Sequence, residues 1–135
     1  MSIILLVECL SLLFLLVCSA FFSSAETALF SLNTIQIHRA RRMRPRSAAL
    51  IEGLLAVPEN LLSTILIGNT LVNVAASALG FIVADELFPG RGEAIAIPVM
   101  TVVLLIMGEV TPKRLAMSHP ELLATRYARL LEALV

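Results

Sequence analysis

The apolar segment 100–114 holds a carboxylate and a proline whose spacing could create a cation site. Glu109 directly follows Gly108 near the end of the apolar run. An acidic side chain at a bilayer centre costs about 2.5 to 3.5 kcal/mol on insertion scales, so we expect a cation to compensate it. Pro112 has no N–H and cannot bond to the Gly108 carbonyl four residues earlier. The segment therefore predicts a carboxylate beside a free carbonyl, and both are hard oxygen donors.

Lys113 offers a competing interpretation of Glu109. The two residues are four apart, which is the spacing of a salt bridge along one helix face. We prefer the cation because Pro112 argues against an undisturbed helix at this point.

Two asparagines lie in the middle of the apolar segment 61–84. Asn69 and Asn73 are four residues apart, so they share a helix face. Hydrogen bonds from them to neighbouring helices would contribute about 0.6 kcal/mol each on average. Alternatively, their carbonyl oxygens coordinate a cation, and the sequence leaves both interpretations open.

A row of hydroxyl groups marks the end of the first apolar segment. Ser19, Ser23 and Thr27 are spaced four apart and line one helix face. For Ser23, the sequence is compatible with coordination of a cation and with bonding back to the preceding helical turn. We interpret Ser19 and Ser24 as packing residues whose hydroxyls bond to that turn.

Three long, nearly uncharged segments must position these groups. Of the 135 residues, 59% are hydrophobic, and the segments 3–22, 61–84 and 94–112 each approach the roughly 20 residues that span a bilayer. We predict an all-α integral membrane protein with three transmembrane helices. A cleaved signal peptide is disfavoured for the first segment because Glu8 lies inside it and no basic residue precedes it.

The charge distribution predicts the side of the membrane on which each connection lies. Five arginines lie in residues 39–46, whereas residues 85–93 carry three acids and Arg91 alone among bases. The positive-inside rule then places the N-terminus outside and the C-terminus in the cytoplasm. We expect the arginines to contact anionic lipids. Nucleic-acid binding is disfavoured because no aromatic residues are interleaved with them.

Amphipathic juxtamembrane helices are expected at two places. One follows Pro45 and has an apolar stripe at helical spacing. The other follows the pattern of a capping box, Ser118 to Glu121. On this second helix we expect one apolar side made of Leu122, Leu123, Tyr127, Leu130, Leu131 and Leu134.

The combined donors define a class of ligand. Hydroxyl, amide, backbone carbonyl and carboxylate oxygens suit sodium, magnesium or calcium, and not zinc or copper. Gly and Pro at membrane depth are typical of transporter sites. No histidine lies within the three segments and we find no nucleophile–base pair, so we do not expect an enzyme.

Three motifs make a specific resemblance. FFSSAETALFSL (21–32), IGNTLVN (67–73) and MGEVTPK (107–113) resemble the transmembrane domain of the CorC/CNNM (cyclin-M) magnesium transporter family, over essentially all of residues 1–135. The resemblance implies three transmembrane helices with a cytoplasmic amphipathic belt helix, assembled as a homodimer through the transmembrane helices. It also implies magnesium efflux across the plasma or inner membrane, with sodium as a candidate coupling ion. Cytoplasmic CBS domains that bind ATP would follow this domain in the full-length protein.

The same resemblance implies an ion site. By motif, Ser23, Asn73 and Glu109 would bind magnesium, and Asn69 and Thr27 would lie near it. Gly108 would contribute its backbone carbonyl. Ser24 stands beside Ser23, so the sequence leaves open which hydroxyl faces the ion.

Two other functions are compatible with these residues. The domain could be a non-transporting module that senses magnesium or dimerises cytoplasmic domains. A sodium-coupled carrier of an organic substrate is disfavoured because the site is small and lacks aromatic residues.

Overall fold

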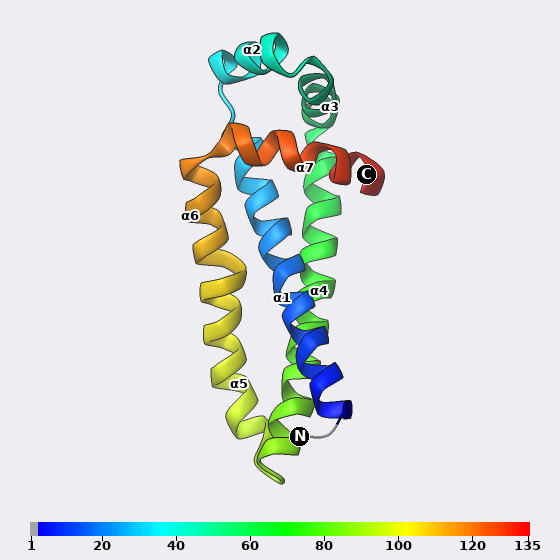
Figure 1. The fold of residues 1–135 in the computed structure, drawn as a ribbon, viewed down its shortest axis with the longest axis vertical. Coiled ribbons are helices and arrows are strands. Elements are labelled where there is room, and N and C mark those ends of the chain that lie inside the picture. The colour runs from blue at the N-terminus through cyan, green and yellow to red at the C-terminus, as the bar shows by residue number, and fades with distance from the viewer. Residues whose placement is uncertain (1–2) are drawn as a thin grey trace.

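The computed structural model describes residues 3–135, which form an elongated bundle (Figure 1). Within these residues the chain consists of helices and short connections, as the sequence predicts. In chain order the helices are α1 (Ile3–Phe30), α2 (Thr34–Met43), α3 (Pro45–Ala56), α4 (Pro58–Leu87), α5 (Gly92–Val103), η1 (Leu104–Val110), α6 (Thr111–Ser118) and α7 (Pro120–Leu134).

Three long helical segments run along the bundle: α1, α4, and the continuous run of α5, η1 and α6 (Figure 1). Each is long and apolar enough to cross a membrane. The prediction of an all-α membrane domain with three spanning helices is therefore confirmed. The helices are longer than the predicted apolar segments. In α1 this is because Ala25, Ala28 and Leu29, beyond its most apolar part, are buried in the core.

Helix η1 is a π-helical segment within the third span. The Thr111 N–H bonds to the carbonyl of Ile106, five residues earlier. Pro112 is the second residue of α6 and follows η1 closely, so its missing N–H falls where the helix changes its hydrogen-bond pattern. The departure from a regular α-helix that is expected near Pro112 is therefore present. It takes the form of π-helical turns and not of unwound backbone. Such π-turns occur frequently at functional sites, and this one contains Gly108 and Glu109.

Helices α2, α3 and α7 gather at the end of the bundle where α1 finishes, and the α4–α5 connection lies at the other end (Figure 1). The arginine-rich connection and the C-terminal helix thus share one end, as the predicted topology requires. Assignment of this end to the cytoplasm stays a prediction.

Helix α2 carries most of the arginine run, and the apolar pattern does not predict it. Its signal is polar: the Asn33 side chain accepts a hydrogen bond from the Gln36 N–H (2.8 Å), and the Gln36 side chain accepts one from the Asn33 N–H (3.0 Å). This reciprocal capping box satisfies two otherwise free donors of the first turn.

Three of the arginines bond to neighbouring helices. Arg39 pairs with Glu121 of α7 (3.1 Å), and Arg44 donates to Thr125 of α7 (3.0 Å). Arg41 pairs with Glu52 of α3. Exposed ion pairs of this kind contribute about 0 to 1 kcal/mol each, so they orient α2 more than they stabilise it.

Helix α7 departs from its predicted pattern in two ways. It begins one residue later than a Ser118 cap would require, because the Ser118 hydroxyl donates to the Arg114 carbonyl (3.1 Å) and Glu121 pairs with Arg39. Its buried face is also different, because small side chains allow α7 to approach the helices it packs on. Ala124, Ala128 and Leu131 are buried, whereas three members of the predicted stripe are exposed: Leu122, Leu130 and Leu134.

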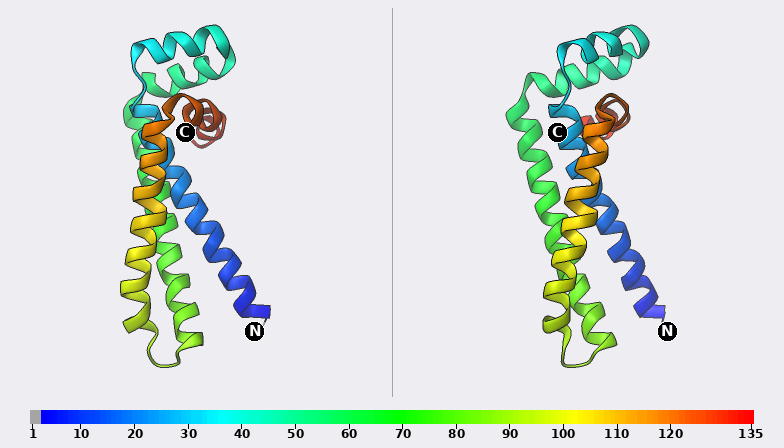
Figure 2. Two further views of the ribbon diagram at one scale, coloured as in Figure 1. Left: turned by 60° about the vertical axis from the view of Figure 1, so that its left-hand side comes forward. Right: turned by 90° about the vertical axis from the view of Figure 1, so that its left-hand side faces the viewer.

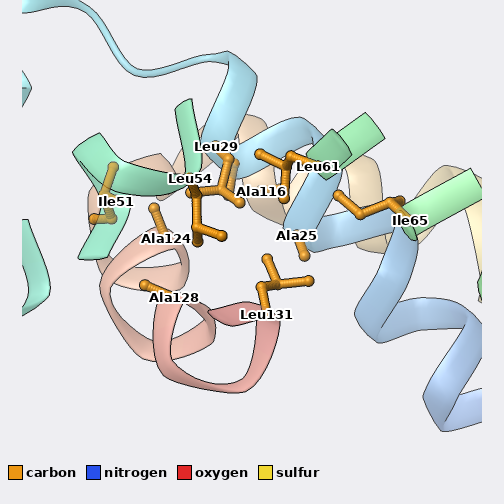
Figure 3. Packing of buried hydrophobic residues seen from close by; sticks show 11 residues of the cluster. Ala25, Leu29, Ile51, Leu54, Leu61, Ile65, Ala116, Ala124, Ala128 and Leu131 are labelled. Carbon is orange, nitrogen blue, oxygen red and sulfur yellow. The ribbon is translucent and has the colours of Figure 1, made fainter. Parts of the chain in front are cut away.

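The apolar core lies where α7 crosses the bundle (Figure 3). It joins α1, α3, α4, α6 and α7 through side chains that include Leu29, Ile51, Leu61, Ala116 and Leu131. Tyr127 adds an edge-on contact with the Phe21 ring, at 4.9 Å between centroids. The core therefore fixes the end of α1 that follows its row of hydroxyl groups.

The first half of α1 diverges from α4 and α5 (Figure 2). Its large apolar side chains are exposed within this chain: Ile3, Ile4, Leu6, Val7, Leu10, Leu13, Phe14 and Val17. The hydroxyl groups of α1 that were singled out from the sequence thus lie between the packed core at one end of the bundle and the exposed first half of α1 at the other.

Candidate cation site

A hydrogen bond between α1 and α4 forms the centre of the candidate site. The buried Ser19 hydroxyl donates to Asn73 Oδ1 at 2.6 Å, and lies 3.4 Å from Asn69 Oδ1. The interpretation of Ser19 as a packing residue that bonds to its own helix is therefore wrong. Its spacing matched that of Ser23, but the offset between α1 and α4 decides which hydroxyl meets the asparagines.

The third span joins the cluster through Glu109. Asn69 Nδ2 donates to Glu109 Oε1 at 3.5 Å, so α4 bridges α1 and η1. The structure therefore brings together four of the residues singled out from the sequence and adds Ser19. We call the set Ser19, Asn69, Asn73, Gly108 and Glu109 the polar cluster.

Two glycines allow the three helices to approach one another at this level. A Cβ atom on Gly108 would lie 2.8 Å from Ser19 Oγ, and one on Gly68 would lie 2.5 Å from the Phe22 ring. Both distances are shorter than real Cβ contacts. Glycine is thus required for close helix contact, as is usual in membranes.

Glu109 also pairs with Lys113. The Lys113 Nζ atom lies 3.3 Å from Glu109 Oε2, so the salt bridge that the sequence disfavours is present. Its physical reason is that the chain stays helical: η1 passes directly into α6, and the two side chains remain on one face. The pair and a bound cation compete for the same carboxylate.

Ser23 is buried, with 1% of its surface exposed, and its hydroxyl has no hydrogen-bond partner among residues 3–135. It lies one helical turn beyond Ser19. A buried hydroxyl without a partner is costly, and a bound ion would supply one. Ser24 bonds to the Phe21 carbonyl (3.1 Å), as expected for a packing residue, and to the Tyr127 hydroxyl (3.3 Å).

Thr27 does not join the polar cluster. It lines a groove between α1, α4 and α6 together with Glu26, Ser31 and Lys113. Because Lys113 lines the groove and pairs with Glu109 of the polar cluster, the groove leads to this cluster from the end of the bundle that carries α2 and α7.

The donor set is poor in charge. Within residues 3–135, no group of three or more histidine, cysteine or acidic side chains is placed to hold a metal ion. The polar cluster offers one carboxylate and several neutral oxygens. Such a set suits a hard cation held with moderate affinity and does not suit a permanently bound structural metal.

Fold and site together define a class: a polytopic membrane domain with oxygen donors from three spanning helices around one carboxylate. The chain belongs to the CNNM family, since the model of the cyclin M transmembrane N-terminal domain matches residues 10–135.

Curated relatives agree with this assignment. The chain is 45% identical over 106 residues to the UPF0053 inner membrane protein YfjD of Escherichia coli (strain K12), covering 78% of this chain and 25% of the relative. It is 41% identical over 110 residues to a UPF0053 protein of Haemophilus influenzae, covering 82% and 26%. A chloroplastic DUF21 domain-containing protein of Arabidopsis thaliana is 37% identical over 103 residues, covering 76% and 16%. The chain thus spans about a quarter or less of the length of these relatives.

Proposed function

We propose that this domain transports magnesium across a membrane and binds the ion between α1, α4 and η1. The observation that carries the proposal is the convergence of polar groups from three spanning helices on Glu109. Polar and ionisable groups at membrane depth are expensive and usually serve ion pathways. The membrane domain of a CNNM family member is a fitting place for such a pathway.

The proposed ligands are Ser23, Asn73 and Glu109, with Ser19 added. Glu109 supplies the charge, and Asn73 Oδ1 and a serine hydroxyl supply neutral oxygens. Asn69 lies beside them, the Gly108 carbonyl is a further candidate, and Thr27 would lie on the approach to the site. The unpartnered Ser23 hydroxyl supports this set because an ion would satisfy it.

The charge balance favours release as well as binding. One carboxylate does not neutralise a divalent cation, so affinity should be moderate. Magnesium also gives up its water molecules reluctantly, and a set of neutral oxygens does not hold it permanently. A transporter needs both properties, because the ion must leave the site on each cycle.

The cellular setting is proposed from the family. We propose efflux across the plasma or inner membrane, with sodium as coupling ion, and no enzymatic activity in this domain. We further propose a homodimer through the transmembrane helices, which the exposed apolar face of the first half of α1 supports. CBS domains would regulate the domain from the cytoplasm.

Asn73→Ala tests the proposal. The change removes Asn73 Oδ1, which is a proposed ligand of the ion and accepts the hydrogen bond from Ser19. Magnesium flux should therefore fall by at least about tenfold, the effect of losing about 1.4 kcal/mol of binding free energy. The measurement is flux into proteoliposomes that enclose a magnesium-sensitive dye. Asn60→Ala, the same change at an exposed position at the start of α4, is the control and should keep full flux.

The flux assay also separates the alternative function. If the protein binds magnesium at the polar cluster but moves none across the liposome membrane, it is a magnesium-sensing or dimerising module. Equal flux in wild type and Asn73→Ala would contradict the proposed site.

A further inference from the structure

We propose that Lys113 is a tethered counter-cation, which holds Glu109 while the site is empty and is displaced when a magnesium ion enters. The inference rests on the proposed function and assigns a role to a residue outside the proposed ligand set. Lys113 is the single lysine of the sequence, and the other nine of its ten lysine and arginine residues are arginines.

Both carboxylate oxygens of Glu109 are engaged in this structure. Lys113 Nζ lies 3.3 Å from Oε2, and Asn69 Nδ2 donates to Oε1 at 3.5 Å. A divalent cation on this carboxylate would lie close to both groups and repel the ammonium charge and the amide hydrogens. Entry of magnesium therefore favours withdrawal of Lys113 and rotation of Asn69 so that its carbonyl oxygen faces the ion.

The position of Lys113 makes withdrawal easy. Its side chain is 46% exposed, whereas that of Glu109 is 34% exposed. It lines the groove that contains Glu26, Thr27 and Ser31. Its ammonium group can therefore move into the groove and towards the carboxylate of Glu26. Lysine suits this task because its ammonium is a compact, strongly hydrated charge on a flexible stem, whereas an arginine would hold a carboxylate in a fixed, two-bonded geometry.

The exchange also limits the charge that the site must carry. With Lys113 in place the carboxylate and ammonium sum to zero. Magnesium binding with Lys113 withdrawn leaves one net positive charge, whereas binding with Lys113 retained would leave two. Displacement therefore lowers the repulsion in a partly buried site, and return of Lys113 favours release of the ion.

A single lysine makes the movement measurable. The purified chain in lipid nanodiscs would be treated with an amine-reactive reagent, with magnesium chloride or with potassium chloride of equal ionic strength, and the modification rate of Lys113 followed by mass spectrometry. We expect magnesium to raise this rate about threefold or more. In Glu109→Gln the rate should be high with either salt.

Binding measured by calorimetry gives the second readout. Lys113→Met removes the competitor, so the Kd for magnesium should fall about threefold to fivefold, the range that a half-exposed ion pair supports. A purely structural role for the pair would leave Kd unchanged or raise it. Arg114→Met, the loss of the neighbouring surface charge, should leave Kd unchanged.

The outcomes separate the two proposals. Magnesium binding that is lost in Asn73→Ala, combined with a Lys113 modification rate that does not rise, would overturn the counter-cation and leave the site intact. Absence of magnesium binding to the unaltered chain would overturn the proposed function and the counter-cation with it.

Discussion

Glu109→Gln is expected to abolish magnesium binding and transport while the helices stay folded. The substitution removes the one negative charge of the polar cluster and keeps the size of the side chain. Two unit charges 4 Å apart interact by about 4 kcal/mol at an effective dielectric constant near 20, and 1.4 kcal/mol is a factor of ten in affinity. We therefore expect Kd to rise at least about a hundredfold.

The fold should tolerate this change. The Glu109–Lys113 pair is partly exposed, and such pairs contribute about 1 kcal/mol or less to stability. Calorimetry and proteoliposome flux measure the effect, and thermal unfolding checks the fold. Glu121→Gln removes a surface carboxylate that pairs with Arg39 and should retain wild-type binding. Flux in Glu109→Gln equal to that of the Glu121→Gln control would exclude Glu109 from the ion site.

Gly108→Ala should produce the second large effect through a single added methyl group. The new Cβ would lie 2.8 Å from Ser19 Oγ, so the Ser19 hydroxyl must move away from Asn73 or α1 must shift. Overpacking of this kind costs about 1 to 3 kcal/mol. If this free energy is lost from magnesium binding because the ligands are displaced, the affinity for magnesium drops about tenfold to a hundredfold.

Gly53→Ala is the matched control, because a Cβ on this helical glycine meets no atom within 4 Å. It should bind and transport magnesium as the wild type does. A Gly108→Ala variant with unchanged Kd would show that the close contact between η1 and α1 is unrelated to the ion.

The spans were predictable because length and hydropathy alone decide them. Residues 61–84, for example, lie wholly within α4 (Pro58–Leu87). The buried face of α7 was not predictable from the sequence. Whether Ala124 or Leu122 points inward depends on how closely α7 approaches its neighbouring helices. A stripe of large apolar residues does not reveal a face built on alanine.

The site was predictable in part for a similar reason. Spacing placed Asn69 and Asn73 on one face and joined Gly108 to Glu109. It could not choose between Ser19 and Ser23, because that choice depends on the axial offset between α1 and α4, where Phe22 fits against Gly68. Nor could it establish the Glu109–Lys113 pair, since Pro112, directly before Lys113, disfavours a regular helix. In the structure the chain stays helical there because η1 adopts wider π-helical turns.

An experimental structure of the domain in lipid with magnesium bound would show whether the ion occupies the polar cluster. We expect the ion between α1, α4 and η1, with oxygens of Glu109, Asn73 and a serine hydroxyl at about 2.0 to 2.1 Å. Lys113 should then have left the carboxylate. A magnesium ion held elsewhere, with the Ser19–Asn73 hydrogen bond and the Glu109–Lys113 pair intact, would contradict the proposed site.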